Sequence, residues 1–282
     1  LSAIEAGTGG FVINGVSAGD QSGLSVSSAG DVNGDGFDDL IIGALRDDPN
    51  GTDSGASFVV FGKTGTGTVQ LSAIETGTGG GFVINGVSTG DVSGYSVSSA
   101  GDVNGDGLGD LIIGAPSDDP NGTSSGSSFV VFGKTGTGAV ELSTIEAGTG
   151  GFVINGVSAD DRSGGSVSSA GDVNGDGLDD LIVGAPSDDP NGPFSGASFV
   201  VFGKTGTGMV ELSDIEAGIG GFVINGVSAG DRSGFSVSSA GDVNGDGFDD
   251  LIIGARFDDP NGANSGASFV VFGGDFTGAA TQ

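Results

Sequence analysis

The sequence predicts an all-β protein, a β-propeller of four four-stranded blades, and three observations support this. A motif that begins Asp-Val-Asn-Gly-Asp-Gly starts at residues 31, 102, 172 and 242, so the 282-residue chain repeats itself every 70 or 71 positions. Each unit holds short runs rich in Val, Ile and Phe, separated by Gly, Asp, Asn and Pro, as is typical of strands and turns. No stretch has sustained helical periodicity. Four antiparallel strands repeated around an axis form a propeller.

Four strands are expected in each unit, and the first unit illustrates them. Its β-forming runs are FVINGV at 11–16, LSVSSAG at 24–30, DLIIGA at 39–44 and ASFVVFG at 56–62. The second run is rich in Ser, Ala and Gly, which suits an inner strand beside a narrow axis. The third and fourth runs carry the apolar residues expected at contacts between blades. The segment LSAIE at 1–5 is expected to form at most one helical turn.

The order of the runs predicts how a ring would close. The chain begins with the run assigned to the outer edge, 11–16, whereas the last run, 267–273, ends a unit that lacks its own outer strand. We expect residues 11–16 to complete the last blade and close a four-bladed ring, because closure removes open sheet edges. Four blades of a larger ring and a β-solenoid are the alternatives. The expected organisation is one domain, 1–282, with repeats of about 1–70, 71–141, 142–211 and 212–282.

The composition excludes several function classes. The chain has 37 acidic and 7 basic residues, a net charge of −30, so nucleic acid is not an expected partner, because phosphate binding depends on Lys and Arg. So acidic a surface attracts cations. The absence of Cys and His removes disulfides, thiolate or imidazole nucleophiles and the usual zinc ligands. No apolar run approaches the roughly 18 residues of a membrane span, and no membrane insertion is expected.

The loop DVNGDGFDD at 31–39 has the pattern of a calcium site. Oxygen-bearing side chains occupy loop positions 1, 3, 5 and 9, the main-chain oxygen of position 7 can join them, and the glycines permit a tight bend. Calcium prefers six to eight oxygen ligands in flexible geometry. We expect about four Ca²⁺ ions, one per repeat. The expected ligands are Asp31, Asn33, Asp35, Phe37 and Asp39; Asp102, Asn104, Asp106, Leu108 and Asp110; Asp172, Asn174, Asp176, Leu178 and Asp180; and Asp242, Asn244, Asp246, Phe248 and Asp250.

The loop is not an EF-hand. An EF-hand places a bidentate Glu at position 12 and a helix on either side, whereas position 12 here is Ile42, inside a β-forming run. The second copy has Gly109 at position 8, where the other copies have Asp. We expect position 8 to point outward, so that this difference leaves the site intact.

These motifs resemble FG-GAP repeats, the blades of the integrin α-subunit propeller and of related bacterial surface proteins. The resemblance rests on GxSVSSAGDVNGDGxxDLIIGA followed by SGASFVVFG, and it covers all four units. It implies that the acidic loop joins the first and second strands of a blade and binds calcium. Integrin propellers have seven blades, so the larger ring that these four units could belong to is seven-bladed. The Gly-Ala-Pro sequence that gives the family part of its name is present only at 114–116 and 184–186.

Two further acidic motifs recur in every unit. The first is DDPNG, at 47–51 and its equivalents, which is read as a β-turn between strands, with a second cation site as the alternative. The second is Asp20, with Asp91, Asp161 and Asp231, which either caps a turn or lies near the axis. Neither suggests catalysis, and the chain is not expected to be an enzyme.

The expected function is that of a calcium-binding, calcium-stabilised extracellular β-propeller, a structural or adhesive module of a secreted bacterial surface protein. One alternative is an integrin-like domain that binds a protein or glycan through loops on one face, with the partner site at the residues that vary between units, 45–46 and 52–54 and their equivalents. The other is a subunit that associates with itself into a filament or layer.

Overall fold

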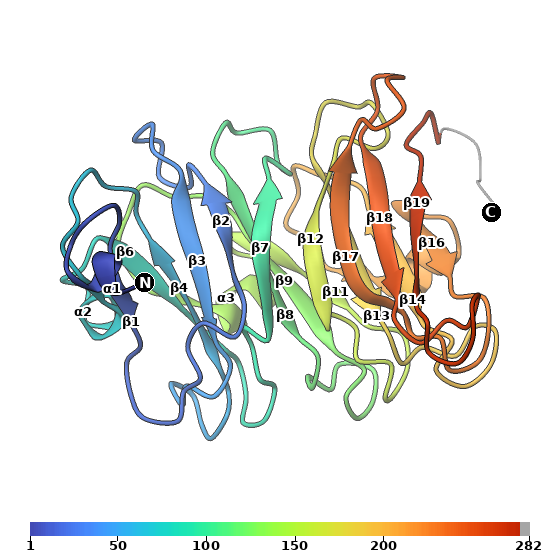
Figure 1. The fold of residues 1–282 in the computed structure, drawn as a ribbon, viewed down its shortest axis with the longest axis horizontal. Helices are drawn as coiled ribbons and strands as arrows, with labels where there is room; N and C mark the ends of the chain where they lie inside the picture. Colours follow the sequence, from blue (N-terminus) through green and yellow to red (C-terminus); the bar gives the residue numbers. More distant parts are fainter. Residues whose placement is uncertain (277–282) are drawn as a thin grey trace.

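The computed structural model describes residues 1–276, and its strands form a curved row of sheets (Figure 1). The strands are β1 (Ile13–Asn14), β2 (Val26–Gly30), β3 (Asp39–Ala44), β4 (Ala56–Val60), β5 (Val69–Gln70), β6 (Gly81–Asn85), β7 (Ser96–Gly101), β8 (Asp110–Ala115), β9 (Ser127–Val131), β10 (Val140–Glu141), β11 (Gly151–Asn155), β12 (Ser166–Gly171), β13 (Asp180–Ala185), β14 (Ala197–Val201), β15 (Val210–Glu211), β16 (Gly221–Asn225), β17 (Ser233–Gly241), β18 (Asp250–Ala255) and β19 (Ala267–Val271). The helices are α1 (Ser2–Glu5), α2 (Leu71–Glu75), α3 (Leu142–Glu146) and α4 (Leu212–Glu216). The prediction of an all-β chain with at most one helical turn at each LSxIE segment agrees with these short helices.

Each repeat builds one antiparallel sheet, and the following repeat supplies its outer strand. We call them sheet 1 (β2, β3, β4, β6), sheet 2 (β7, β8, β9, β11), sheet 3 (β12, β13, β14, β16) and sheet 4 (β17, β18, β19). The predicted strand order, from the Ser-rich strand through the third and fourth runs to the FVIN strand, is confirmed in sheets 1 to 3. Within the described residues, sheet 4 has three strands and no outer strand.

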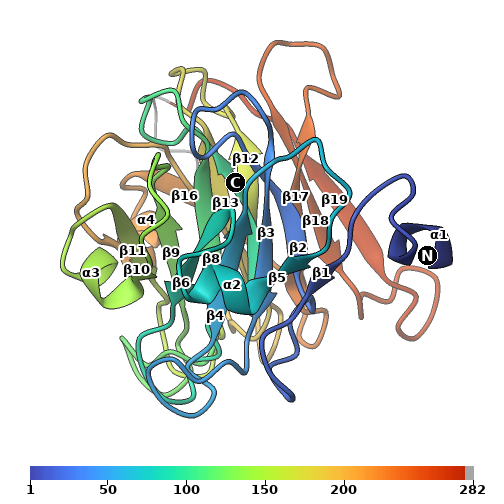
Figure 2. The ribbon, with the colours of Figure 1, turned by 90° about the vertical axis from the view of Figure 1, so that its left-hand side faces the viewer.

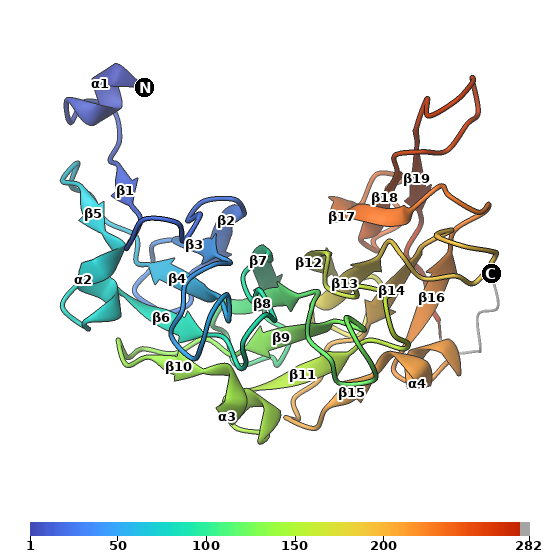
Figure 3. The same ribbon diagram turned by 90° about the horizontal axis from the view of Figure 1, so that it is seen from below.

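The expected closure of a four-bladed ring by residues 11–16 is wrong for this structure. β1 pairs in parallel with β5, with Ile13 opposite Val69, rather than with β19. Figure 3 shows β1 and β19 at opposite ends of an open arc, with the inner strands on its concave side. The physical reason is that β5 offers a nearby parallel edge that holds β1 beside sheet 1, far from sheet 4.

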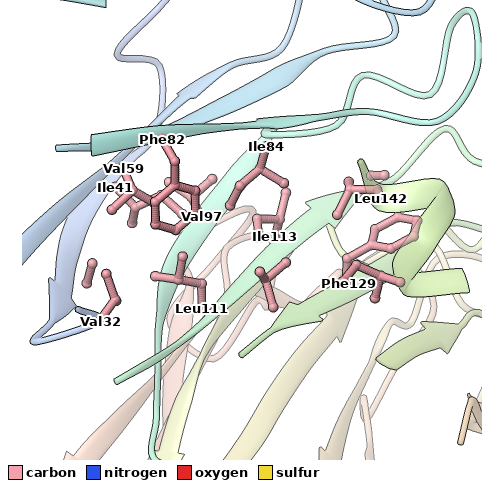
Figure 4. Packing of buried hydrophobic residues seen from close by; sticks show 14 of the residues in the cluster. Val32, Ile41, Val59, Phe82, Ile84, Val97, Leu111, Ile113, Phe129 and Leu142 are labelled. Carbon is pink, nitrogen blue, oxygen red and sulfur yellow. The ribbon is translucent and has the colours of Figure 1, made fainter. Parts of the chain in front are cut away.

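Apolar contacts between neighbouring sheets form the core. Ile41 and Val59 of sheet 1 pack against Leu111 and Ile113 of sheet 2, and all four side chains are buried (Figure 4). The equivalent residues form the contacts between sheets 2 and 3 and between sheets 3 and 4. Because the same side chains recur every 70 or 71 residues, one packing solution is used three times. This confirms that the third and fourth predicted runs carry the contacts between sheets.

Glycine allows the sheets to approach closely. A Cβ atom added at Gly43, Gly114 or Gly184 would lie 2.0–2.1 Å from the carbonyl oxygen of Gly94, Gly164 or Gly234 in the next sheet. At Gly254 of sheet 4 the nearest atom would be 3.6 Å away. These strand positions therefore must be glycine wherever another sheet follows.

A two-residue strand reaches back from each unit to the sheet before it. β10 follows sheet 2 but pairs in parallel with β6, the outer strand of sheet 1, and β15 pairs in the same way with β11. The helix that follows each of these strands buries a Leu and an Ile, as Leu142 and Ile145 do in α3. Neither feature was predicted from the sequence.

Candidate metal centres

The four acidic loops lie at the same edge of the sheets. Each joins the two innermost strands of its sheet, as the loop from β2 to β3 does in sheet 1. Figure 1 shows all four loops along its upper side. This agrees with the position that the resemblance implies.

Backbone N–H groups fold the loop around its first carboxylate. Asp31 Oδ1 accepts hydrogen bonds from the N–H groups of Gly34 at 2.8 Å and Asp35 at 3.1 Å, and its Oδ2 accepts one from Gly36 at 2.8 Å. These bonds, that of Gly36 first, hold the pKa of Asp31 below its ordinary value. Gly34 and Gly36 have φ values of 75° and 88°, a conformation that glycine adopts without steric strain. The glycines are therefore what bends the loop inward.

The side chains at positions 3 and 5 form the next two turns. Asn33 Oδ1 accepts the N–H of Asp35 at 2.8 Å, and Asp35 Oδ1 accepts the N–H of Phe37 at 2.9 Å. The same bonds recur in the other repeats. In the second repeat, Asn104 Nδ2 also lies 3.1 Å from Asp106 Oδ2. Positions 1, 3 and 5 of the loop therefore each accept backbone N–H groups of the loop, and their convergence on an ion stays a prediction.

The carboxylate at position 9 is buried at the base of the loop. Asp39 Oδ2 accepts the N–H of Val32 at 3.1 Å, and its Oδ1 accepts the N–H of Gly62 at 2.8 Å. Burial raises the pKa of the equivalent Asp110 and Asp180 to about 7, and the carboxylates at positions 5 and 1 of their own loops add to the increase. The buried carboxylate therefore lies at the base of a loop that also carries the negative charges of positions 1 and 5.

The donor set fits a hard cation that binds oxygen. Side-chain oxygens at positions 1, 3, 5 and 9 lie on one short loop, and every carboxylate oxygen that accepts one N–H keeps a further lone pair. Across residues 1–276, no three Asp, Glu, His or Cys side chains are already placed as a preformed metal group. Binding of calcium by these donors stays a prediction.

In sheets 3 and 4, position 8 does not point outward, contrary to expectation. Asp179 Oδ2 accepts the N–H of Asp102 at 2.7 Å, which joins the loop of sheet 3 to that of sheet 2. Gly109 lacks the side chain for this bond, but its N–H donates to the main-chain oxygen of Asp31 at 2.9 Å, and the N–H of Asp179 makes the equivalent bond to Asp102 at 3.3 Å. Alternation along the loop suggested an outward direction, but a neighbouring loop occupies that space. Position 8 therefore links loops in series.

The two other acidic motifs are turns. DDPNG at 47–51 lies in the loop between β3 and β4, where Asn50 Nδ2 donates to the carbonyl oxygen of Gly86 at 2.8 Å. Asp20 Oδ2 accepts the N–H of Ser17 at 2.7 Å, and its three equivalents do the same in their units. The prediction of a turn at DDPNG is confirmed, and of the two alternatives for Asp20 the structure favours the turn cap. A second cation site at the DDPNG motifs stays an alternative.

Sequence reasoning missed a clamp between neighbouring units. Glu141 of β10 accepts hydrogen bonds from Asn85 Nδ2 at 2.7 Å and Asn50 Nδ2 at 3.0 Å, which belong to β6 and to the β3–β4 loop of sheet 1. Glu211 binds its own pair of Asn residues in the same way. The equivalent position in the first unit is Gln70, and this difference between near-identical units was the available signal.

Comparison with known proteins agrees with this geometry. The family model for the FG-GAP repeat matches residues 22–60, 93–140, 163–201 and 233–271, more than half of the chain. Integrin alpha-PS2 of Drosophila melanogaster is 33% identical over 186 residues, 63% of this chain and 12% of the relative. Integrin alpha pat-2 of Caenorhabditis elegans is 34% identical over 252 residues, 84% of this chain and 18% of the relative. Phosphatidylinositol-glycan-specific phospholipase D of Homo sapiens is 32% identical over 176 residues, 61% of this chain and 20% of the relative.

The chain thus spans a fifth or less of the length of these relatives, which are mostly integrin alpha subunits. The shared part coincides with the repeated sheets and the loops between their inner strands. On the repeat period, the strand order and the four matched segments together, the chain belongs to the FG-GAP repeat family.

Proposed function

We propose that the chain is a calcium-stabilised extracellular β-propeller segment that serves as a structural or adhesive module. The observation that carries the proposal is that loop positions 1, 3, 5 and 9 keep their oxygen-bearing side chains in all four units. A single acidic loop would be explained as a turn, whereas four copies with the same donor positions point to a ligand.

The residues of each loop have distinct tasks in this proposal. Asp31, Asn33 and Asp35 supply side-chain oxygens, Phe37 supplies its main-chain oxygen, and Asp39 anchors the base of the loop to Val32 and Gly62. A bound Ca²⁺ ion would supply positive charge that offsets the repulsion among the carboxylates. The bonds at position 8 would then connect one ordered loop to the next.

Calcium should stabilise the fold, because it would bind the folded chain and not the unfolded chain. At a hundredfold excess over Kd, each site adds about 2.7 kcal/mol to the free energy of unfolding. Thermal unfolding with 2 mM calcium and with excess chelator tests this, and equilibrium dialysis should count about four ions per chain. An unchanged melting temperature in chelator would overturn the proposal, and magnesium serves as the control for a general charge effect.

Recognition of a protein or glycan partner is the second candidate, and one pocket favours it. A cavity of about 240 Å³ is lined by Tyr95, Pro116, Arg162, Pro186 and Phe235, among other residues. Residues 45 and 46 vary between units, and their equivalents line this cavity. They are Pro116 with Ser117 in the second unit and Pro186 with Ser187 in the third. A partner could thus be selected by residues that the repeats do not share.

Binding of the chain to arrays of extracellular proteins and glycans would test this second function. Tyr95→Ala should weaken a real interaction by tenfold or more, since aromatic and Arg anchors dominate such sites. The exposed Met209→Ala is the matched control. Binding that neither substitution changes would exclude the pocket as the partner site.

Three further predictions concern the domain organisation, the size of the ring and the source of the protein. They are the single domain over residues 1–282, membership of a seven-bladed ring, and a bacterial surface protein as the source. None of the described helices is long and apolar enough to span a membrane. The net charge of −30 continues to argue against nucleic acid.

A further inference from the structure

Within residues 1–276, the cavity that contains Tyr95 and Arg162 is lined only by positions at which the four units differ. Its lining residues are the equivalents of positions 21, 24, 45 and 46 of the first unit: Val92, Tyr95, Pro116 and Ser117; Arg162, Gly165, Pro186 and Ser187; and Arg232 and Phe235. Each of these positions holds three or four different residue types across the units, whereas residues 25–36 are the same in every unit. We call this cavity the variable pocket.

The variable pocket lies at the end of the strands opposite the acidic loops. Positions 21 and 24 lie at or just before the start of the inner strand of each sheet, and positions 45 and 46 follow the next strand. The acidic loop joins the other ends of these two strands, so the pocket is on the lower side of Figure 1. Figures 2 and 3 show α3 and α4 beside the outer strands, away from the inner strands β12 and β17. A ligand of the pocket would therefore bind away from the acidic loops.

Three successive units of the chain build the pocket. Tyr95 precedes β7 of sheet 2, Arg162 precedes β12 of sheet 3, and Phe235 belongs to β17 of sheet 4. The pocket thus spans two of the close contacts between sheets, at which a Cβ added to Gly114 or Gly184 would lie 2.0 or 2.1 Å from a carbonyl oxygen of the following sheet. Its walls are therefore fixed by sheet packing within these three units.

The backbone holds both arginines of the pocket in a left-handed conformation. Arg162 and Arg232 have φ values of 56° and 53°, which residues other than glycine rarely adopt. The N–H of Arg162 donates to the main-chain oxygen of Ser124 at 3.1 Å, and that of Arg232 donates to Phe194 at 3.0 Å. Val92, their equivalent in the second unit, has a φ of 53° as well. The fold therefore fixes the backbone at this position, while the side chain that it presents differs between units.

All four arginines of the chain occupy these variable positions. Arg162 and Arg232 are at position 21, Arg256 is at position 45, and Arg46 is at position 46. The three lysines instead support the fold, because each donates to the main-chain oxygen of a glycine four residues later: Lys63, Lys134 and Lys204. A chain with a net charge of −30 thus keeps its arginines for positions that vary between units.

The chain's own carboxylates do not neutralise the two arginines of the pocket. In residues 1–276 neither Arg162 nor Arg232 forms an ion pair, and Arg232 lies over the ring of Phe194, 5.2 Å from its centroid. The adjacent Asp161 and Asp231 are buried, and each accepts the N–H of a serine three residues earlier. Two guanidinium groups with unused N–H donors therefore line one cavity, and their planar geometry matches a carboxylate.

The other walls of the pocket favour a sugar acid over an acidic side chain of a protein. Tyr95 and Phe235 are 41% and 38% exposed, and the faces of such rings attract the C–H groups of a sugar ring. Ser117 and Ser187 add hydroxyl groups that can bond to sugar hydroxyls. The volume of about 240 Å³ suits a single sugar ring. An Asp or Glu side chain would leave the aromatic and hydroxyl groups without partners.

We propose that the variable pocket binds an acidic glycan, a carbohydrate that carries carboxylate groups. One carboxylate would accept hydrogen bonds from Arg162 and Arg232, and the C–H face of its sugar ring would pack against Tyr95 or Phe235. This inference rests on the partner-binding function proposed above and names the chemistry of the partner. It does not depend on calcium binding at the acidic loops.

Titration calorimetry of the full chain with three carboxylated oligosaccharides tests the proposal. The probes are a hyaluronan tetrasaccharide, trigalacturonate and sialyllactose, each with its carboxyl-reduced form as the matched neutral ligand. At least one acidic probe should bind with a Kd below about 1 mM, and its reduced form should bind roughly tenfold more weakly. Failure of all three acidic probes to bind, or equal binding of the reduced forms, would overturn the proposal.

Substitution of the arginines tests where the acidic probe binds. Arg162→Gln and Arg232→Gln should each weaken its binding by about tenfold or more, because a charge-assisted hydrogen bond is lost. Arg46→Gln is the matched control, since it removes the same charge from an exposed arginine that does not line the pocket. Circular dichroism should show the same fold for all three variants. An equal loss in Arg46→Gln would reveal a general charge effect and contradict the proposed site.

The variant Tyr95→Ala separates failure of this inference from failure of the partner-binding function. If a protein or neutral glycan binds, and Tyr95→Ala weakens that binding while Arg162→Gln does not, the pocket is a partner site but not one for an acid. Tighter binding of tetraglutamate than of every carboxylated sugar would instead assign the pocket to an acidic peptide. If no ligand depends on Tyr95, both the inference and the partner-binding function at this pocket are wrong.

Discussion

Asp249 and Asp172 join two acidic loops that lie on neighbouring sheets. Asp249 Oδ2 accepts the N–H of Asp172 at 3.0 Å, and the N–H of Asp249 donates to the main-chain oxygen of Asp172 at 3.2 Å. Each bond crosses from sheet 4 to sheet 3. Through such pairs, each loop is held by the unit that follows it.

The first prediction concerns this link. Asp249→Ala should lower the free energy of unfolding by about 1–2 kcal/mol, because a hydrogen bond to a charged group is lost. Asp38→Ala, at the same loop position of sheet 1, should have almost no effect, because that side chain is exposed. Urea unfolding of both variants makes the comparison. Equal effects would contradict the link.

The second prediction concerns one calcium ion. Asp106→Asn keeps an oxygen that can accept the N–H of Leu108 but removes the charge at position 5. The variant should bind one ion fewer and lose up to about 2.7 kcal/mol of the stabilisation by calcium at a hundredfold excess over Kd. In chelator it should be as stable as the wild type. Asp119→Asn, in a DDPNG turn, is the control, and a lost ion there would instead reveal a second cation site.

The third prediction concerns the close approach between sheets. Gly184→Ala should cost about 2 kcal/mol or more, because its Cβ would lie 2.1 Å from the carbonyl oxygen of Gly234 and the sheets would have to separate. Gly254→Ala adds the same methyl group at the equivalent position without a neighbour. Thermal unfolding of the two variants should therefore differ sharply, and similar melting temperatures would argue against this packing.

The fourth prediction concerns pH. Burial, followed by repulsion from Asp118, raises the pKa of Asp91 to about 6, and burial with repulsion from Asp188 does the same for Asp161. Asp119 and Glu146 add to the effect at Asp91. Since these folded-state values exceed the ordinary value of 3.8, the stability that the protonated groups contribute is complete below pH 3.8. It is lost as the pH rises through about 6.

The double variant Asp91→Asn with Asp161→Asn isolates this contribution. Each Asn keeps an oxygen for the N–H of Ser88 or Ser158. At pH 7.5 the variant should melt higher than the wild type by roughly 2–4 °C, and at pH 4.5 the difference should shrink toward zero. Melting curves at constant calcium give the comparison. A variant that melts below the wild type at pH 7.5 would show that the charged carboxylates stabilise the fold.

The repeat made most of the architecture predictable from the sequence. The strand order and the turns at Asp20 and DDPNG follow from local chemistry, since β-branched runs and Asx turns depend on neighbouring residues. The turns made by Asp31, Asn33 and Asp35 are local too, whereas their role as calcium ligands stays a prediction. Contacts between distant residues were harder to foresee. Asp179 bonds to Asp102, 77 positions earlier, and nothing in the local pattern distinguishes it from an outward-pointing side chain.

The closure of the ring was wrong for a related reason. Residues 11–16 have the sequence of an outer strand, and that sequence suits every equivalent edge equally well. Which edge they join depends on β5, a two-residue strand with no signal of its own. Gly43 and its equivalents likewise appeared as ordinary strand glycines until the carbonyl of the next sheet was in view.

The short strands β10 and β15, which pair with the outer strand of the preceding sheet, affect the order in which the sheets unfold. Sheet 1 cannot leave the row until β10 has released β6, and sheet 2 is held to the following unit by β15 in the same way. Because units of a repeat array are stabilised mainly by their neighbours, these two parallel pairings should slow the separation of sheets 1 and 2. Hydrogen exchange at the N–H groups of β6 and β11 should therefore slow down when β10 and β15 are paired and speed up when Glu141 or Glu211 is replaced by Ala.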